Sequence, residues 1–188
     1  MKTFAIIPEK LSADSVVNSL PYLIKFGVDY LYLRGMTNST EIRELVEEIN
    51  KTDIIPVLYN KNLSDQPGLV YGIHYKSTEI DLIPEKKPSC AIVTASAHDA
   101  DTAKDLLEKG VDYVYVSPVF KPFSKEGDCR EFFPRDRIIS LNREFGERVV
   151  LLGGLTRDRI EDLKKNIKND FSVAGITLFF NNPQKNVT

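Results

Sequence analysis

Residues suited to holding an anion follow short apolar runs at several points of this 188-residue sequence. Arg34 closes the run GVDYLYLR, and Ser117 closes the similar run GVDYVYVS. A guanidinium can donate two parallel hydrogen bonds to phosphate or carboxylate oxygens, and Lys61, Lys76 or Lys125 would add point charges beside it. These residue types favour the binding of a small anionic molecule, above all a phosphate.

A glycine pair and a histidine stand in front of two expected helices. Gly153 and Gly154, in LLGGLT, either bring the backbone close to a phosphate at a helix N-terminus or form a tight turn. His98, in SAHDADTA, would be a ligand contact, a proton carrier or an exposed neighbour of a helix cap. His74 lies inside an apolar run and is expected to be buried and hydrogen-bonded to a tyrosine. No Ser-His-Asp order, HExxH motif or P-loop is present, so the sequence gives no support to triad, zinc-protease or nucleotide-hydrolase chemistry.

Eight short apolar or β-branched runs, separated by helical patterns, must position these residues. We expect strands at residues 3–7, 29–33, 54–59, 68–75, 90–95, 112–116, 148–152 and 172–179. Alternating strands and helices are typical of parallel strands joined by right-handed crossovers. Eight units predict an α/β fold, a closed (β/α)8 TIM barrel, with residues 1–188 as a single domain. It should be a small barrel, with abbreviated helices after strands three and four and little or no eighth helix.

Helix signals between the expected strands support this assignment. Candidate N-caps are Asn38, Asp99 and Thr156, and candidate C-terminal stops are Gly110 and Gly146. Pro134 suits the first turn of a helix. Pro21 lies within the first expected helix, roughly residues 14–26, and predicts either a kink or a late start there.

Side-chain alternation decides which residues of the second strand face the barrel interior. With a period of two, Tyr30, Tyr32 and Arg34 lie on one side of the strand, and the leucines between them lie on the other. Because the aliphatic side should meet the helices, the tyrosines are expected in the lumen, and the sixth strand repeats the pattern up to Ser117. Arg34 and Ser117 then reach the C-terminal rim, where barrel enzymes hold their active sites. Other candidates on this rim are Asn60, Lys61, Lys76, Glu79, Ser96, His98, Lys125, Gly153 and Gly154.

Composition and charge exclude several classes of partner. The chain has 25 Lys plus Arg against 27 Asp plus Glu and no basic stripe interleaved with aromatics, which argues against a general nucleic-acid surface. No signal peptide or run of about 18 apolar residues is visible, so we expect a cytoplasmic protein without a membrane segment. Its expected partners are small molecules or further subunits, with homo-oligomerisation left open. The two cysteines, Cys90 and Cys129, would lie at opposite ends of the barrel, too far apart for a disulfide.

The ordered rim motifs resemble the thiamine phosphate synthase and TenI (thiazole tautomerase) superfamily of (β/α)8 barrels. The most specific stretches are GIHYKSTE, SAHDADTAKDLLEKGVDYVYVSPVFKPFSK and LLGGLT. They are similar to the family patterns Gly-Val-His-Leu-Gly-Gln-x-Asp, Ser-x-His, Gly-Pro-x-Phe-x-Thr-x-Thr-Lys and Ile-Gly-Gly-Ile. The similarity runs from VDYLYLRGMT to SVAGITLF, which is most of the chain.

The resemblance implies a function and a set of site residues. The synthase joins hydroxymethylpyrimidine diphosphate to thiazole phosphate, giving thiamine phosphate and pyrophosphate, with Mg2+ and cationic side chains stabilising the departing charge. Arg34, Asn60 and Lys125 match diphosphate-binding positions, and Gly153 and Gly154 match the thiazole-phosphate site. The candidate catalytic residues are Arg34, Lys61, His98 and Lys125, and the candidate substrate-binding residues are Tyr32, Asn60, Ser96, Ser117, Pro118, Ser124, Gly153 and Gly154.

Several residues depart from the family pattern. Lys61 replaces one magnesium-binding carboxylate, and a cation cannot ligate another cation, which leaves Glu79 as the candidate metal ligand. Tyr32 replaces a glutamine of the diphosphate cluster, and Phe179 with its neighbouring ring is expected to narrow or block a phosphate pocket. Pro118 stands where the tautomerase carries its catalytic histidine. Three hypotheses therefore remain open: a divergent synthase in which Lys61 supplies the charge of magnesium, a thiazole tautomerase, and a non-catalytic barrel that binds a phosphorylated ligand or a protein.

Overall fold

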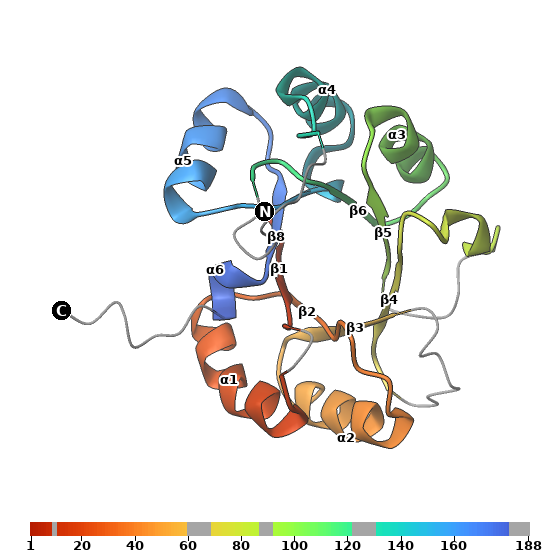
Figure 1. Ribbon diagram of the computed structural model, residues 1–188, viewed down its shortest axis with the longest axis vertical. Coiled ribbons are helices and arrows are strands. Elements are labelled where there is room, and N and C mark those ends of the chain that lie inside the picture. The colour runs from red at the N-terminus through yellow and green to blue at the C-terminus, as the bar shows by residue number, and fades with distance from the viewer. Residues whose placement is uncertain (9–10, 60–68, 87–91, 122–130, 181–188) are drawn as a thin grey trace.

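Eight parallel strands close into a barrel in the computed structural model, which describes residues 1–8, 11–59, 69–86, 92–121 and 131–180 (Figure 1). They follow one another around the barrel in chain order, and β1 pairs with both β2 and β8. The strands are β1 (Thr3–Ile6), β2 (Tyr30–Tyr32), β3 (Ile55–Tyr59), β4 (Gly72–Tyr75), β5 (Val93–Ala97), β6 (Tyr113–Val116), β7 (Val149–Leu152) and β8 (Ser172–Gly175). The predicted (β/α)8 fold is confirmed.

Helices cover the outside of the barrel unevenly (Figure 1). They are α1 (Ala13–Lys25), α2 (Ser39–Ile49), α3 (Ala100–Glu108), α4 (Arg135–Phe145), α5 (Arg157–Asn166) and α6 (Thr177–Phe180), with 3-10 turns η2 (Ile80–Leu82) and η3 (Gly146–Arg148). As predicted, η2 is the sole helical element in the described part of the β4–β5 link, and the last helix is a single turn. Most of the β3–β4 link, residues 60–68, lies outside the described residues, as do both cysteines. Among the described residues, no helix has the length and apolar character needed to cross a membrane.

Predicted caps begin three of the helices. Side-chain oxygens of Asn38, Asp99 and Thr156 accept backbone N–H groups in the first turns of α2, α3 and α5. α1 is capped by Ser12 and continues through the exposed Pro21, so a late start of this helix is not observed. These local signals fix where each helix begins and therefore how each preceding loop leaves the rim.

The aspartates of the repeated GVDY phrase hold neighbouring strands in register. Asp29, just before β2, accepts the backbone N–H of Thr3 in β1 at 2.8 Å, and Asp112, just before β6, accepts that of Val93 in β5 at 2.6 Å. β5 runs from Val93 to Ala97, whereas the sequence predicted a strand over residues 90–95. In the parallel register of β5 with β6, Ser96 lies opposite Tyr115.

The predicted alternation of the tyrosines is confirmed. Tyr30, Tyr32 and Tyr115 belong to the cluster inside the barrel, where the Phe4 ring stacks on the Tyr30 ring with centroids 4.5 Å apart. Leu31 packs instead in the apolar layer beneath α1 and α2, and the valines of β6 pack in the apolar layer beneath α3, α4 and α5. The lumen is therefore filled with aromatic side chains below the rim.

The end of β8 differs from the prediction. The strand stops at Gly175, and the residues expected to prolong it turn into α6. This turn buries Phe179 in the outer layer, where its ring meets the Phe26 ring of α1 edge-on at 5.7 Å. The expectation that Phe179 narrows the rim pocket is wrong, because burial against α1 removes this ring from water more completely than a position at the open rim would.

Candidate functional site

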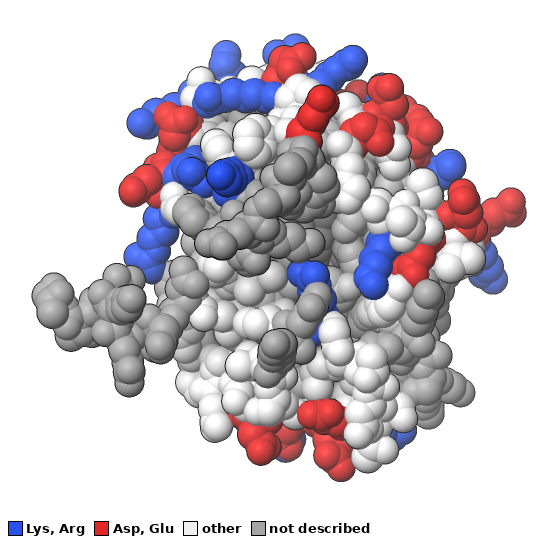
Figure 2. Space-filling view, viewed as in Figure 1, with Lys and Arg blue, Asp and Glu red and all other residues white. Residues whose placement is uncertain are grey.

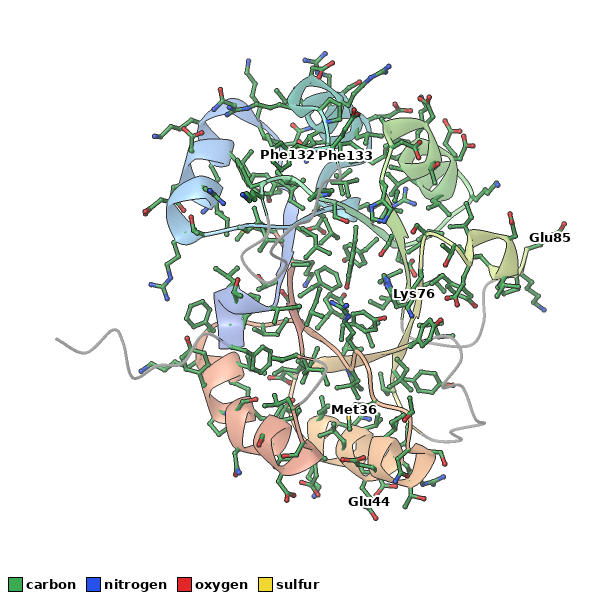
Figure 3. All side chains as sticks on the ribbon, in the orientation of Figure 1. Met36, Glu44, Lys76, Glu85, Phe132 and Phe133 are labelled. Carbon is green, nitrogen blue, oxygen red and sulfur yellow. The ribbon has the colours of Figure 1, made fainter. Side chains whose placement is uncertain are left out.

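A cavity of about 300 Å3 opens at the C-terminal rim of the barrel. It is lined by Ile6, Tyr32, Arg34, His74, Lys76, Ser77, Thr78, Ser96, His98, Tyr115 and Leu152. Figure 2 shows basic side chains at the edge of a hollow near the middle of this face, and Figure 3 shows Lys76 beside β4 at the side of the barrel opening. A larger cavity of about 530 Å3 lies outside the barrel between η2 and α3, away from the rim cations. The rim cavity is the candidate site because its lining includes the predicted site residues Tyr32, Arg34, Ser96 and His98 together with the cation Lys76.

The floor of the rim cavity is a buried histidine held by two hydroxyl groups. His74 Nδ1 lies 2.8 Å from Thr94 Oγ1, and Nε2 lies 3.0 Å from Ser96 Oγ. Its ring packs between Tyr32 and Tyr115, with centroids 4.6 and 5.0 Å away. The prediction that His74 is buried is confirmed, but its hydrogen bonds go to Thr94 and Ser96 and not to a tyrosine. Thr94 and Ser96 lie two residues apart on one face of β5, and this face meets the His74 ring.

Burial keeps His74 neutral. Desolvation lowers its pKa to about 3, with Glu79 acting against this shift and Lys76 and Arg34 adding to it. Neutral imidazole can hold its proton on either nitrogen, so Ser96 either donates to Nε2 or accepts from it. The polarity that Ser96 presents to the cavity is coupled in this way to the tautomer of His74.

His98 stands at the edge of the cavity with one nitrogen already engaged. Its Nδ1 lies 2.7 Å from the carbonyl oxygen of Ser117. A carbonyl only accepts hydrogen bonds, so Nδ1 carries the proton and Nε2 of the neutral ring is left as an acceptor. Ser117 is buried beneath His98, and Pro118 follows it through a cis peptide bond. The predicted residues His98, Ser117 and Pro118 are thus brought together, with His98 exposed to solvent and suited to proton transfer.

Arg34 and Lys76 supply the positive charge of the cavity wall. Arg34 follows β2 and acts electrostatically on both Tyr32 and His74. Lys76 follows β4, and its Nζ lies 4.1 Å from the centroid of the Tyr59 ring. Tyr59, which sequence analysis did not single out, donates its hydroxyl hydrogen bond to Glu79 Oε1. Partial burial and this carboxylate raise the pKa of Tyr59 to about 12.

The glycine pair lies where two rim loops touch. Gly153 and Gly154 have φ values of 101° and 62°, in the region that favours glycine. A Cβ on Gly154 would lie 2.3 Å from the carbonyl oxygen of Lys121, and one on Gly153 would lie 3.0 Å from Cα of Pro118. The close approach that these glycines permit is therefore to the loop after β6, and their contact with a phosphate stays a prediction.

The described residues do not fit a magnesium site. Among them no three His, Cys, Asp or Glu side chains gather to hold a metal, and Glu79, the predicted ligand, already accepts from Tyr59. Mg2+ binds through one or two carboxylates together with waters and substrate phosphates. Among the described residues the site offers only the Glu79 carboxylate, which is already hydrogen-bonded to Tyr59. The predicted residues Asn60, Lys61, Ser124 and Lys125 lie outside the described residues.

Three comparisons relate the chain to known proteins. A family model described as thiamine monophosphate synthase matches residues 68–176. The chain is 25% identical over 194 residues to a putative thiamine-phosphate synthase 2 of Aquifex aeolicus, covering 95% of this chain and 97% of that protein. It is 26% identical to a thiamine-phosphate synthase of Prochlorococcus marinus, of which it covers 44%, with 86% of this chain matched. Thiamine phosphate pyrophosphorylase from Pyrococcus furiosus has the same fold, with a TM-score of 0.69 and 18% identity over 94% of this chain and 85% of that chain.

Proposed function

Because the chain belongs to the thiamine monophosphate synthase family, we propose that it joins hydroxymethylpyrimidine diphosphate to thiazole phosphate, forming thiamine phosphate and pyrophosphate. The observation that carries this proposal is the rim cavity, which combines Arg34 and Lys76 with an aromatic floor below them. The cations suit a diphosphate, and the rings of Tyr32 and Tyr115 suit a flat heteroaromatic ring. The family match covers the segment that contributes Lys76, Ser96 and His98.

The chemistry asks the cavity to stabilise a leaving group. The bond between the pyrimidine methylene carbon and the diphosphate oxygen breaks, and its electron pair departs with pyrophosphate. The thiazole nitrogen then donates its lone pair to the methylene cation to form the new C–N bond. Arg34 and Lys76 would offset the charge that grows on the departing oxygen, an effect that is largest where water is excluded. The predicted Asn60, Lys61 and Lys125 would add to this cluster, and Gly153 with Gly154 would receive the thiazole phosphate.

A tautomerase is the second candidate, and the geometry of His98 favours it. The Ser117 carbonyl fixes the proton on Nδ1, which leaves Nε2 free to accept a proton from a thiazole substrate. Proton transfer of this kind needs no diphosphate and no pyrimidine. The third hypothesis is a non-catalytic barrel. Such a protein would bind a phosphorylated ligand in the same cavity, or a protein partner, without converting it.

Product analysis distinguishes these functions. Purified protein supplied with both synthase substrates and Mg2+ should release thiamine phosphate and pyrophosphate in equal amounts. R34K keeps the charge and loses the planar fork, so it should reduce kcat/KM strongly, whereas K164M, which changes an exposed residue of α5, should leave the synthase reaction intact. Isomerisation of thiazole carboxylate phosphate that is lost in H98Q would instead establish the tautomerase. Binding of either precursor without any product would leave the non-catalytic reading.

A further inference from the structure

Lys76 is a cation on the wall of the rim cavity. In the part of the chain that the structure describes, no acidic side chain forms a salt bridge with its ammonium, which instead lies over the Tyr59 ring at 4.1 Å. Lys104, on the outer surface, shows the contrasting arrangement, because its ammonium lies 3.1 Å from both carboxylate oxygens of Glu144. An ammonium that faces a cavity and contacts only an aromatic face retains its capacity to bind an anion.

Glu79 and Tyr59 hold this lysine in place. Glu79 is 8% exposed, and its Oε1 accepts the hydrogen bond of the Tyr59 hydroxyl. Its Oε2 lies 3.5 Å from the backbone nitrogen of Lys76, while the backbone N–H of Glu79 donates to the carbonyl oxygen of Lys76 at 2.9 Å. The carboxylate thus closes the turn after β4 and fixes the phenol ring over which the ammonium lies. A metal bound at Glu79 would have to displace the Tyr59 hydroxyl.

We propose that this rim cavity binds the diphosphate group of its ligand directly through Lys76 and Arg34, without a divalent cation, and that the Tyr59–Glu79 pair positions Lys76 for this contact. The ligand class rests on the proposed function. The Arg34 guanidinium can donate hydrogen bonds to two oxygens of one phosphate at once. The Lys76 ammonium is a compact charge on a flexible side chain and can contact the other phosphate of the diphosphate. Glu79 acts here as a positioning residue through Tyr59 and not as a metal ligand.

Binding of inorganic pyrophosphate, measured by calorimetry in EDTA and again in excess Mg2+, tests this inference. We expect saturable binding in EDTA. K76M, which keeps the length of the side chain and removes the charge, should weaken the affinity about tenfold, the effect of losing one charge-assisted contact. K164M is the matched control, because it removes one charge from the exposed outer face of α5 and should change the affinity by less than about twofold. K76R should retain most of the affinity.

Variants of the supporting pair separate positioning from metal binding. E79Q keeps an oxygen that can accept from Tyr59 and removes the charge that a metal would need, so pyrophosphate binding in EDTA should be preserved or tighter. Y59L removes the ring beneath the ammonium and should weaken binding several-fold, whereas Y59F keeps the ring and should have a smaller effect. Far-UV circular dichroism and thermal unfolding confirm that each variant is folded before its affinity is compared.

Three results would overturn the inference. The first is no pyrophosphate binding in EDTA, and the second is equal pyrophosphate affinities for K76M and K164M. The third is that E79Q no longer binds pyrophosphate and that its affinity no longer responds to Mg2+. These outcomes are separate from the fate of the synthase proposal. Metal-free binding through Lys76 without thiamine phosphate formation would uphold this inference and remove the synthase, whereas a synthase that binds pyrophosphate only with Mg2+ would do the reverse.

Discussion

The protein should lose stability between pH 7.5 and pH 5 because His74 is buried in its neutral form. The sequence contains two histidines, His74 on the cavity floor and His98 at its exposed edge, so few groups titrate in this window. Burial lowers the pKa of His74 from 6.5 to about 3. The unfolded chain therefore binds a proton below pH 6.5 while the folded protein does not, and acid favours unfolding.

The size of this loss follows from the gap between the two pKa values. Each pH unit below 6.5 costs about 1.4 kcal/mol, so His74 alone should lower the free energy of unfolding by about 2 kcal/mol between pH 6.5 and pH 5. Most carboxylates remain ionised at pH 5, which keeps their contribution small. Above about pH 7.5 the ring is neutral in both the folded and the unfolded chain, so His74 adds no pH dependence there.

Urea unfolding of wild type, H74Q and H98Q at pH 7.5 and pH 5 measures this contribution. H74Q should be less stable at pH 7.5 by about 1 to 3 kcal/mol, because its amide replaces the paired ring imperfectly, yet it should lose much less stability on acidification. H98Q, which keeps the buried His74 ring, is the control for a histidine substitution as such. Equal losses in H74Q and wild type would refute the assignment of His74 as the buried neutral group.

Three further predictions follow from particular contacts. G154A should destabilise the fold by more than about 2 kcal/mol in urea unfolding, because its Cβ would lie 2.3 Å from a carbonyl oxygen, whereas G27A, which meets nothing within 4 Å, should cost about 1 kcal/mol from its positive φ alone. F179A should lower the free energy of unfolding by about 3 kcal/mol and leave pyrophosphate affinity unchanged, because the ring packs on α1; a change in affinity would contradict its placement. R34K should weaken pyrophosphate binding in calorimetry by about tenfold, and unchanged affinity would place Arg34 outside the site.

The barrel could be predicted from the sequence because its signals are local. A period of two places Tyr30 and Tyr32 in the lumen and Leu31 outside, whichever residues surround them. Helix caps such as Asn38 and Asp99 are equally local, since each accepts from backbone groups two or three residues ahead. Closure of eight such units then follows from their number and alternation.

The contacts inside the site could not be predicted, because they depend on register between strands. The parallel register of β4 with β5 sets Thr94 opposite His74, and the hydroxyls of Thr94 and Ser96 therefore lie beside the His74 ring. A displacement of one residue would turn these hydroxyls to the opposite face of the strand. Sequence alone left His74 with a tyrosine partner for this reason.

The supporting pair at the rim is a second contact that sequence concealed. Tyr59 ends β3 and Glu79 begins the η2 turn, so the hydrogen bond between them joins residues 20 positions apart. The position of Tyr59 at the end of a lumen-facing strand was the available signal. The sequence pattern could not predict that the Tyr59 hydroxyl reaches Glu79, the predicted metal ligand, because this contact depends on the geometry of the loop after β4.

Release of pyrophosphate from hydroxymethylpyrimidine diphosphate, measured with and without thiazole phosphate, tests the central claim most directly. The proposed synthase should release pyrophosphate only when both substrates are present, in an amount equal to the thiamine phosphate formed, and K76M should slow this release relative to K164M. Failure of the wild-type protein to release pyrophosphate from both substrates together, in the presence of Mg2+, would contradict the claim that the rim cavity is a synthase active site.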